Sequence, residues 1–437
     1  MSIRPKVICA HVLFSFLFFI ACKKTSTPPA STPPPPTPPT IASPSVTALL
    51  SATLHPGDTV TILGKNLGII IAHLSISLND SIPLTVYQAK DSIVTAVLPG
   101  ASRFPYYGSR SFQLDFKLAD STTYFDTLTI SVAVPEPTGW FKVYASTTTF
   151  NTYTFQPVGI NFPSDSIGYL FTANMTLKTR DGGDSWQQTG DSLVSSPTCM
   201  YVLDSSHLWY GGLFGNIISS SDAGNSWSGY AALNYQTNDL DGLYMSSPTS
   251  GKYVNGFGQI YSITGSPGAT TATLEYQSQN YGGIGGNEVV YPSFSSIDQN
   301  NLLIGGAFTF TVKTNGVYDE YSLPSNVFTA QIVKVQLVSS TLGYAFDYNG
   351  NLFQYTGNRN WSSLNKQGTA FWFTSATTGY IADSQNIYQT NDGGQTWTPA
   401  FALQSGDVVY AFAAHNGKVW AIGSNGTTTG FIYKYNP

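Results

Sequence analysis

The sequence predicts an all-β protein, and three observations carry the prediction. Short runs of alternating apolar and polar residues recur along most of the chain, as in half-buried strands. The composition suits strands joined by tight turns, because 41 of the 437 residues are Gly, 14% are aromatic and only 10% are charged. A Ser/Thr-x-Asp-x-Gly-x-x-Trp segment occurs three times, which indicates a repeated structural unit.

Residues 1–22 have the features of a targeting segment. Arg4 and Lys6 precede an apolar run that is too short to span a membrane and that ends at Ile20-Ala21-Cys22. This junction resembles a bacterial lipobox, which implies cleavage before Cys22 and lipidation of its thiol. The alternative is an ordinary signal peptide with an incidental cysteine. The resemblance implies a lipid-anchored protein of the bacterial cell envelope, at the outer membrane, with surface exposure left open.

Residues 23–44 are dominated by proline, serine and threonine, a composition that cannot build a core. An extended polyproline II segment rises about 3.1 Å per residue, so this one reaches roughly 60–70 Å. We interpret it as a stalk.

Residues 45–135 are predicted to form a β-sandwich. Alternation is clearest in residues 58–64, 74–78, 112–118 and 128–132, with turn residues between these runs. The segments Pro56–Gly68 and Ser92–Pro99 resemble the IPT/TIG family. That resemblance implies an immunoglobulin-like sandwich that serves as a spacer or a binding module.

Residues 138–437 contain the three repeats. In each copy the Asp carboxylate can accept turn N–H groups, the Gly can take a positive φ, and the Trp can bury its ring. We therefore expect a structural role for Asp181, Gly183, Trp186, Asp222, Gly224, Trp227, Asp392, Gly394 and Trp397.

These repeats resemble the Asp-box, or BNR repeat, of sialidase-type and sortilin-type β-propellers. Strands that begin Gly-Tyr, as at Gly168 and Gly379, make the segment similar to photosystem II stability/assembly factor-like propellers. The resemblance implies a propeller with a non-catalytic binding habit. It also implies a basic surface for members that act in photosystem assembly, and this chain is poor in Lys and Arg.

The C-terminal end of the propeller segment predicts how the ring closes. Residues 408–435 supply three strands where a full unit has four, and residues 139–144, headed by Trp140, form a spare strand. The sequence therefore predicts seven blades closed by pairing N- and C-terminal strands, which leaves no open sheet edge.

The sequence offers no catalytic or metal site. Sialidases clamp their substrate with three arginines, and residues 138–437 hold only Arg180 and Arg359. Glu275, Glu288 and Asp319 have no spacing that pairs them, so we interpret them as solvated loop carboxylates. His207 and His415 lack ligand spacing, and no cofactor is expected.

Charge and cysteine usage exclude two further classes. The formal net charge is −5 and no basic cluster exceeds Lys23-Lys24, so nucleic acid is not an expected partner. Cys199 is the only cysteine after Cys22, so the mature monomer can form no disulfide. We expect Cys199 to be a buried strand residue.

One longer interval, residues 265–294, supplies candidate ligand contacts in Tyr276, Tyr281 and Tyr291 beside a Gly-rich run. Tyrosine rings stack on sugars and act as hot spots for proteins; an irregular blade strand is the alternative. The expected function is non-catalytic binding of a glycan or an envelope protein by a monomeric chain. The alternatives are a polysaccharide hydrolase and a structural or assembly factor.

Overall fold

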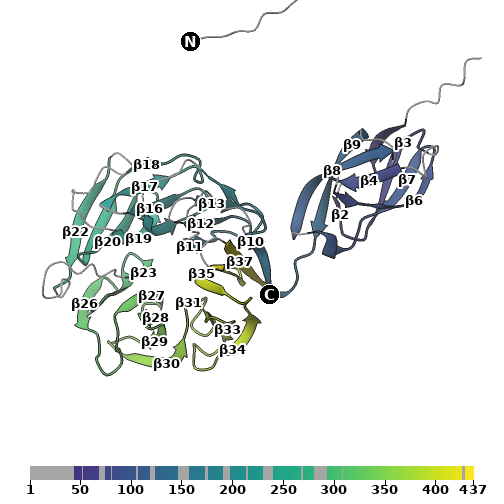
Figure 1. Cartoon of the computed structure of the whole chain (residues 1–437). Coiled ribbons are helices and arrows are strands. Elements are labelled where there is room, and N and C mark those ends of the chain that lie inside the picture. Colours follow the sequence, from purple (N-terminus) through teal and green to yellow (C-terminus); the bar gives the residue numbers. More distant parts are fainter. Residues whose placement is uncertain are drawn as a thin grey trace, which may run out of the picture. The chain divides into compact units, whose positions relative to one another are not determined.

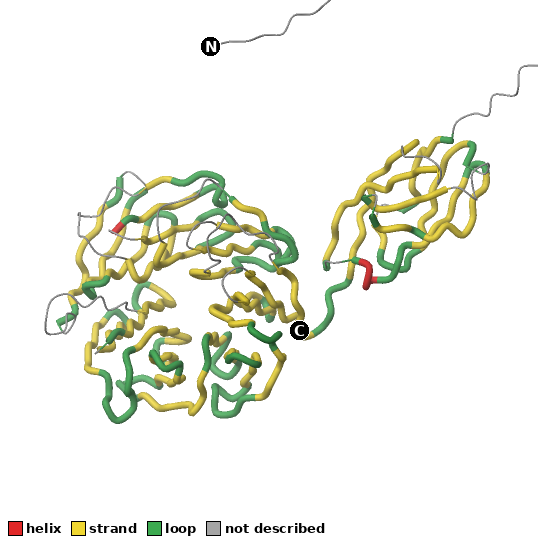
Figure 2. Tube along the Cα trace, viewed as in Figure 1, coloured by secondary structure: helices red, strands yellow, loops and turns green. Residues whose placement is uncertain are grey.

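The structure is a computed structural model of the whole chain (Figure 1). It describes residues 44–51, 53–67, 74–79, 81–104, 107–118, 124–145, 157–172, 176–189, 197–212, 215–229, 240–266, 269–279, 293–307, 309–425 and 429–437. Cys22 and the Pro-rich segment before Pro44 therefore lie outside the described residues. Among those residues, no helix is long and apolar enough to cross a membrane. Strands and loops make up almost all of the trace, with a short 3-10 turn at Ala101–Arg103 (Figure 2).

Residues 45–134 form two sheets. One has the order β1-β3-β7-β6 and the other β2-β9-β8-β4-β5. The strands are β1 Ser45–Leu49, β2 Thr53–Leu54, β3 Thr59–Lys65, β4 Leu74–Leu78, β5 Ile82–Pro83, β6 Thr85–Lys90, β7 Ile93–Val97, β8 Gly108–Leu118 and β9 Tyr124–Val134.

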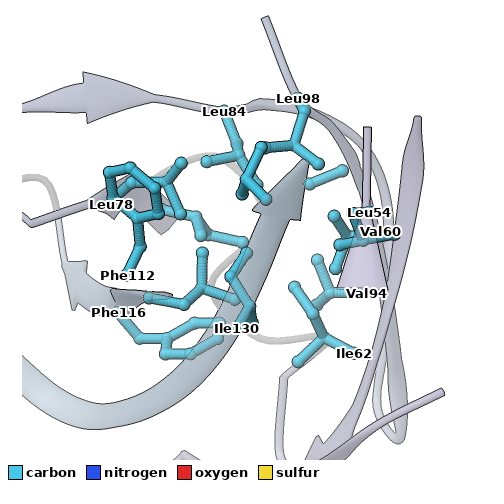
Figure 3. Packing of buried hydrophobic residues seen from close by; sticks show 14 of the residues in the cluster. Leu54, Val60, Ile62, Leu78, Leu84, Val94, Leu98, Phe112, Phe116 and Ile130 are labelled. Atoms are coloured by element: carbon cyan, nitrogen blue, oxygen red, sulfur yellow. The ribbon is translucent and has the colours of Figure 1, made fainter. Parts of the chain in front are cut away.

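A single hydrophobic core joins these two sheets, as Figure 3 shows. Val60 and Ile62 of β3 are buried, whereas Thr59 and Thr61 between and before them are not. Leu114 and Ile130 project into the same core from the other sheet. The alternation in the sequence therefore separates the core face from the solvent face of each strand.

Residues 139–436 include seven four-stranded sheets, which we number 1 to 7. Sheets 1 to 3 contain β11 Pro157–Asn161, β12 Gly168–Thr172, β13 Thr176–Thr179, β14 Gln187–Gln188; β15 Pro197–Val202, β16 Leu208–Gly212, β17 Ile217–Ser220, β18 Ser228–Gly229; and β19 Leu240–Ser247, β20 Ser250–Asn255, β21 Gln259–Thr264, β22 Thr271–Gln277.

Sheets 4 to 6 contain β23 Ser293–Asp298, β24 Asn301–Gly305, β25 Thr309–Thr314, β26 Val317–Ser322; β27 Ile332–Ser339, β28 Leu342–Asp347, β29 Asn351–Tyr355, β30 Trp361–Gln367; and β31 Ala370–Phe373, β32 Gly379–Ala382, β33 Asn386–Thr390, β34 Thr398–Ala402. Sheet 7 contains β35 Asp407–His415, β36 Lys418–Asn425, β37 Thr429–Asn436 and β10 Gly139–Ala145.

The first strands of the seven sheets lie around a common centre (Figure 1). Each contacts the first strand of the next sheet, and β35 of sheet 7 contacts β11 of sheet 1. The first strand of each sheet is therefore the inner strand of a ring, and the fourth strand is the outer one.

The ring closes through β10, which pairs antiparallel with β37 as the sequence predicted. Trp140 lies opposite Tyr435, and Phe141 lies opposite Lys434. The Trp140 ring packs against Tyr380 of sheet 6 at 5.7 Å and against Phe412 of its own sheet at 6.5 Å between ring centroids. The closing strand thus also covers part of the interface between sheets 6 and 7.

The glycine of the Gly-Tyr signature is explained by an aromatic ring that packs against its backbone. A Cβ atom on Gly168 would lie 2.4 Å from the ring of Phe162, so the ring can lie against this backbone only because the residue is glycine. The other face of Phe162 stacks on Trp420 of sheet 7, with ring centroids 3.6 Å apart and planes 6° apart. Phe373 has the same arrangement, between Gly379 and Tyr344 of sheet 5.

We predict that Trp140→Ala lowers the free energy of unfolding by about 3–5 kcal/mol, because it leaves a cavity between sheets 6 and 7. Trp140→Phe, which keeps most of the aromatic packing, should cost much less. Urea unfolding of the full chain measures both. Val317→Ala, at a side chain that is 71% exposed, is the control and should stay within about 0.5 kcal/mol of wild type. A Trp140→Ala variant as stable as this control would contradict the closure interpretation.

Candidate functional site

The three Asp-box hairpins connect the third and fourth strands of sheets 1, 2 and 6. In sheet 2 the Ser226 N–H donates to Asp222 Oδ1 at 2.8 Å, and the Ser226 hydroxyl donates to Oδ2 at 2.6 Å. Gly224 N–H donates to Ser220 Oγ at 2.8 Å, and the Trp227 indole N–H donates to the Gly224 carbonyl at 3.0 Å. Corresponding bonds to the Asp carboxylate and to Ser/Thr Oγ form around Asp181 and Asp392.

These hydrogen bonds occupy the Asp carboxylates within their own turns. The bonds from Ser226 hold the pKa of Asp222 at about 2, and those from Thr396 do the same for Asp392. The glycines Gly183, Gly224 and Gly394 have φ values of 100°, 86° and 94°, where a side chain is strained. These contacts are of the kind expected for a structural turn, and the structural role of the Asp, Gly and Trp of each box stays a prediction.

We predict that Asp222→Ala lowers stability by about 1–2 kcal/mol near neutral pH, because three donors lose a charged acceptor. The folded pKa of about 2 lies below the ordinary 3.8, so this contribution is complete above about pH 4 and is lost as the pH falls toward 2. Urea unfolding at pH 6 and pH 2.5 should show the difference from wild type shrinking. Ser228→Ala, on the exposed strand that follows, is the matched control, and a pH-independent difference would refute the assignment.

The predicted ligand tyrosines fall in two groups. Tyr281 and Tyr291 lie outside the described residues. Tyr276 lies in β22, where its ring stacks on Tyr318 of sheet 4 at 4.4 Å and its hydroxyl donates to Glu320 Oε2 at 2.7 Å. Tyr318 in turn donates to Glu275 Oε1 of sheet 3 at 2.9 Å. One ring face and the hydroxyl of Tyr276 are thus occupied, and its ligand role stays a prediction.

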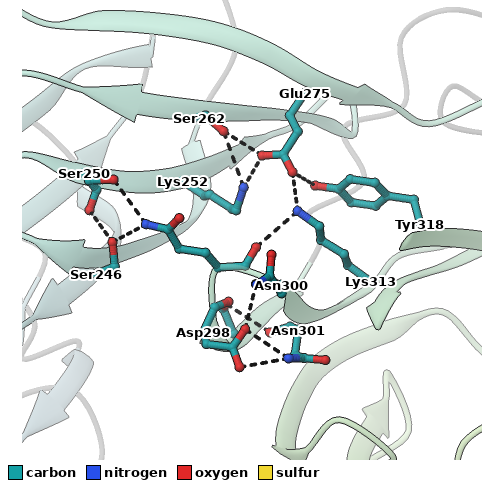
Figure 4. Close-up of polar contacts among 12 residues, drawn as sticks. Ser246, Ser250, Lys252, Ser262, Glu275, Asp298, Asn300, Asn301, Lys313 and Tyr318 are labelled. Atoms are coloured by element: carbon teal, nitrogen blue, oxygen red, sulfur yellow. Dashed lines mark hydrogen bonds and ion pairs between the residues drawn. The ribbon is translucent and has the colours of Figure 1, made fainter. Parts of the chain in front are cut away.

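Glu275 corrects the sequence interpretation, which expected a solvated loop carboxylate. It is the bulged residue of β22, since Ile260 pairs with Tyr276 and the next residue, Tyr261, pairs with Leu274. The bulge turns the carboxylate toward Lys252 and Lys313, which both donate to it (Figure 4). A bulge re-aims a side chain in this way because it adds one residue to the strand.

The ionisation of Glu275 follows from this setting. Burial raises the pKa of its carboxyl, but hydrogen bonds from Lys252, Lys313, Ser262 and Tyr318 outweigh burial and hold the pKa at about 2. A carboxyl that stays ionised at neutral pH is unsuited to act as a general acid. The cluster joins sheets 3 and 4 and has the character of a structural ion pair.

The remaining candidate groups also have partners close to them. Asp319 lies in a strand, half exposed, and pairs with Arg359 at 2.5 Å, so it too is no loop carboxylate; Glu288 lies outside the described residues. His207 pairs with Asp204 at 2.9 Å, and His415 lies 3.5 Å from Asp165. No three His, Cys, Asp or Glu side chains converge to hold a metal ion in the part of the chain that is described.

Cys199 lies on β15, and burial raises the pKa of its thiol to about 12. A thiol in this state is not a nucleophile at neutral pH.

The inner strands carry a feature that the sequence analysis missed. In five sheets the inner strand has one extra residue opposite the second strand, close to its start: Val158, Thr198, Asp241, Val333 and Tyr410. Val333 and Tyr410 are each 45% exposed, which is unusual for apolar residues of an inner strand. In sheets 5 and 7 the bulge thus projects an exposed side chain at one end of the ring.

The same end of the ring carries turns with exposed aromatic residues. Because the first and second strands are antiparallel, the inner strand begins where the second strand ends. The turns after the second strands of sheets 3 and 5 present Phe257 and Tyr348, which are 43% and 71% exposed. Tyr348 N–H donates to the Gln331 carbonyl at 2.8 Å, which places this turn beside Val333.

We call this end of the ring the bulge face and define it by Phe257, Val333, Tyr348 and Tyr410. It lies opposite the Asp-box hairpins, which join third and fourth strands at the other end of each sheet. The sequence contains a signal for this face in two turns, Asn-Gly-Phe-Gly at 255–258 and Asp-Tyr-Asn-Gly at 347–350. Each places an aromatic ring inside a tight turn.

Comparison with protein families and with curated proteins finds no match to this chain. Among solved structures, YCF48 from Cyanidioschyzon merolae is similar, with a TM-score of 0.52 and 15% identity over 68% of this chain and 99% of that chain. YCF48 bound to D1 peptide has a TM-score of 0.54 and 14% identity over 69% of this chain and 98% of that chain. A protein of unknown function from Bacteroides thetaiotaomicron has a TM-score of 0.44 and 11% identity over 91% and 99%.

At these identities the first two similarities show the fold alone. The chain is an all-β protein, and its larger part has the β-propeller fold.

Proposed function

We propose that this chain is a non-catalytic binding protein whose bulge face holds a segment of a partner protein. The observation that carries the proposal is the group of four exposed apolar side chains at one end of the ring. Three of the four are aromatic, and aromatic residues supply much of the energy at protein interfaces. Support also comes from the propeller fold shared with YCF48, of which one structure is bound to a D1 peptide.

The finer architecture belongs to the same proposal. The seven sheets act as a closed seven-bladed propeller with Asp-box/BNR hairpins, and the contact of β35 with β11 supports the closure. The two N-terminal sheets act as an immunoglobulin-like IPT/TIG domain over residues 45–135. The chain works as a monomer.

A non-catalytic role is favoured by the partners of Glu275 and Asp319, the two described residues among the carboxylates singled out in the sequence. Glu275 is held ionised between two lysines, so it does not resemble the raised-pKa acid of a glycoside hydrolase, and the carboxylate of Asp319 is occupied by Arg359. Glycan binding is the second candidate, because Phe257, Tyr348 and Tyr410 expose rings that can stack on sugars.

The bulge face is tested by Val333→Ser combined with Tyr348→Ser. These changes remove apolar contact area from the centre of the proposed surface, and affinity should fall at least about tenfold, the equivalent of 1.4 kcal/mol. Binding is measured on arrays of synthetic peptides tiled from envelope proteins of the organism that encodes the chain, with a glycan array in parallel.

Val317→Ser is the matched control, because Val317 is also 71% exposed but follows a turn at the opposite end of sheet 4. Equal losses in the control and the double variant would refute the assignment of the face. Binding confined to the glycan array would replace the protein ligand with a glycan.

We further propose that the protein is anchored at the outer membrane through a lipid on Cys22, with residues 23–44 as the stalk. Two acyl chains or more are enough for stable anchoring. Cys22→Ala should move the protein from the membrane fraction to the soluble fraction or leave an uncut precursor. Fractionation with immunoblotting and mass spectrometry of the N-terminus measures this. A processed variant that fractionates like wild type would refute the anchor; Cys199→Ala is the control.

A further inference from the structure

Lys334 occupies a position at which the other four inner strands with the same bulge carry a small residue. The residue after the bulge is Gly159, Cys199, Gly242 and Ala411 in those strands, and Lys334 in β27. For the two glycines, close packing explains why the residue is small. A Cβ on Gly159 would lie 2.7 Å from Met200 Sδ, and one on Gly242 would lie 2.3 Å from Phe294 Cβ. A lysine directly after the bulge therefore departs from the small residues that the other four strands carry there.

The Lys334 side chain is directed between sheets 5 and 6. Its Nζ lies 5.5 Å from the centroid of the Phe371 ring on β31. Gln336, two residues along β27, exchanges hydrogen bonds of 2.8 Å with the backbone of Phe373 on the same strand. Lys334 lies nearer the bulge face than Gln336, since Val333 is its direct neighbour in the chain.

Among the described residues, no hydrogen bond or ion pair reaches Lys334 Nζ. β31 has no titratable residue, and β24 has none. Asp347, at the end of β28, accepts bonds from Asn349 and Asn351 in its own turn, and Asp298, at the far end of β23, accepts bonds from Asn300 and Asn301. Burial lowers the pKa of Lys334 to about 8, with no carboxylate opposing it.

We propose that Lys334 binds a carboxylate of the peptide held on the bulge face, either its C-terminus or an Asp or Glu side chain. The inference rests on the proposed function. A partly buried ammonium is costly unless it is paired, and the Phe371 ring alone offsets little of that cost. A ligand carboxylate supplies the missing partner through a charge-assisted hydrogen bond. Val333 and Tyr348, beside it, contact the apolar side chains that flank the carboxylate.

The first arm of the test uses an array of synthetic 12-residue peptides of random sequence, tethered through their N-termini. Each peptide is printed with a free C-terminal carboxyl and as the amide, and in versions with Asp and Glu replaced by Asn and Gln. The wild-type chain should bind carboxylate-bearing peptides at least about tenfold more tightly than their neutral versions. The pair of versions shows whether the C-terminus or a side chain is recognised.

Lys334→Met keeps the aliphatic stem and should abolish that preference, whereas Lys334→Arg should keep part of it. Lys418→Met, at the start of β36 and the other end of the ring, is the control. Peptide binding that is indifferent to the carboxylate, or that Lys334→Met leaves unchanged, overturns the inference and leaves the proposed function standing.

The second arm does not depend on peptide binding. Lysines are reductively methylated with ¹³C, and the Lys334 signal is identified by its loss in Lys334→Met. Saturating sodium propionate should raise the pKa of this group by about one unit, because a bound carboxylate favours the charged amine. No upward shift overturns the inference. A shift without peptide binding on this array or on the array tiled from envelope proteins contradicts the proposed function but retains a carboxylate site at Lys334.

Discussion

Stacking of aromatic rings between neighbouring sheets is the contact on which the ring depends. A four-stranded sheet in this arrangement has two broad faces, and only its neighbours can cover them. The closest stacks are Trp420 on Phe162 and Tyr344 on Phe373, at 3.6 and 3.4 Å between centroids. Each needs a glycine on the other side of the phenylalanine, because a Cβ there would overlap the ring. Every sheet is covered by its two neighbours. A ring that lacked β10 would therefore leave part of the interface between sheets 6 and 7 uncovered.

Polar groups help to cover the facing surfaces of sheets 3 and 4, which carry none of the three Asp-box repeats. Between sheets 3 and 4, Tyr276 and Tyr318 stack, and each donates its hydroxyl to a glutamate of the other sheet: Tyr276 to Glu320 and Tyr318 to Glu275. Lys252 and Lys313 neutralise Glu275 from both sheets (Figure 4). Removing Glu275 would leave Lys252 and Lys313, both buried, without a carboxylate partner, so the cluster fixes the relation of the two sheets more strictly than apolar packing would.

The local features of the fold were predictable from the sequence, and the features that depend on pairing were not. The Asp-box hairpins repeat a short pattern, and the closing strand was visible because Trp140 heads a strand that no other sheet needed. The burial of Glu275 depends on which residue of β22 bulges against β21, and no residue type marks that position. The exposure of Val333 likewise follows from register, so an apolar residue in an inner strand gave no reason to expect it at the surface.

The bulges separate the shape of the ring from the chemistry displayed at its end. An extra residue opposite the second strand contributes no cross-strand pair, so its side chain is free of the register that holds the sheet together. The five positions already carry valine, threonine, aspartate, valine and tyrosine without a change in the strands around them. Mutation at the exposed bulge residues Val333 and Tyr410 can therefore alter the chemistry of the surface while the scaffold keeps its stability, which makes these positions a place where related chains can differ without a change of fold.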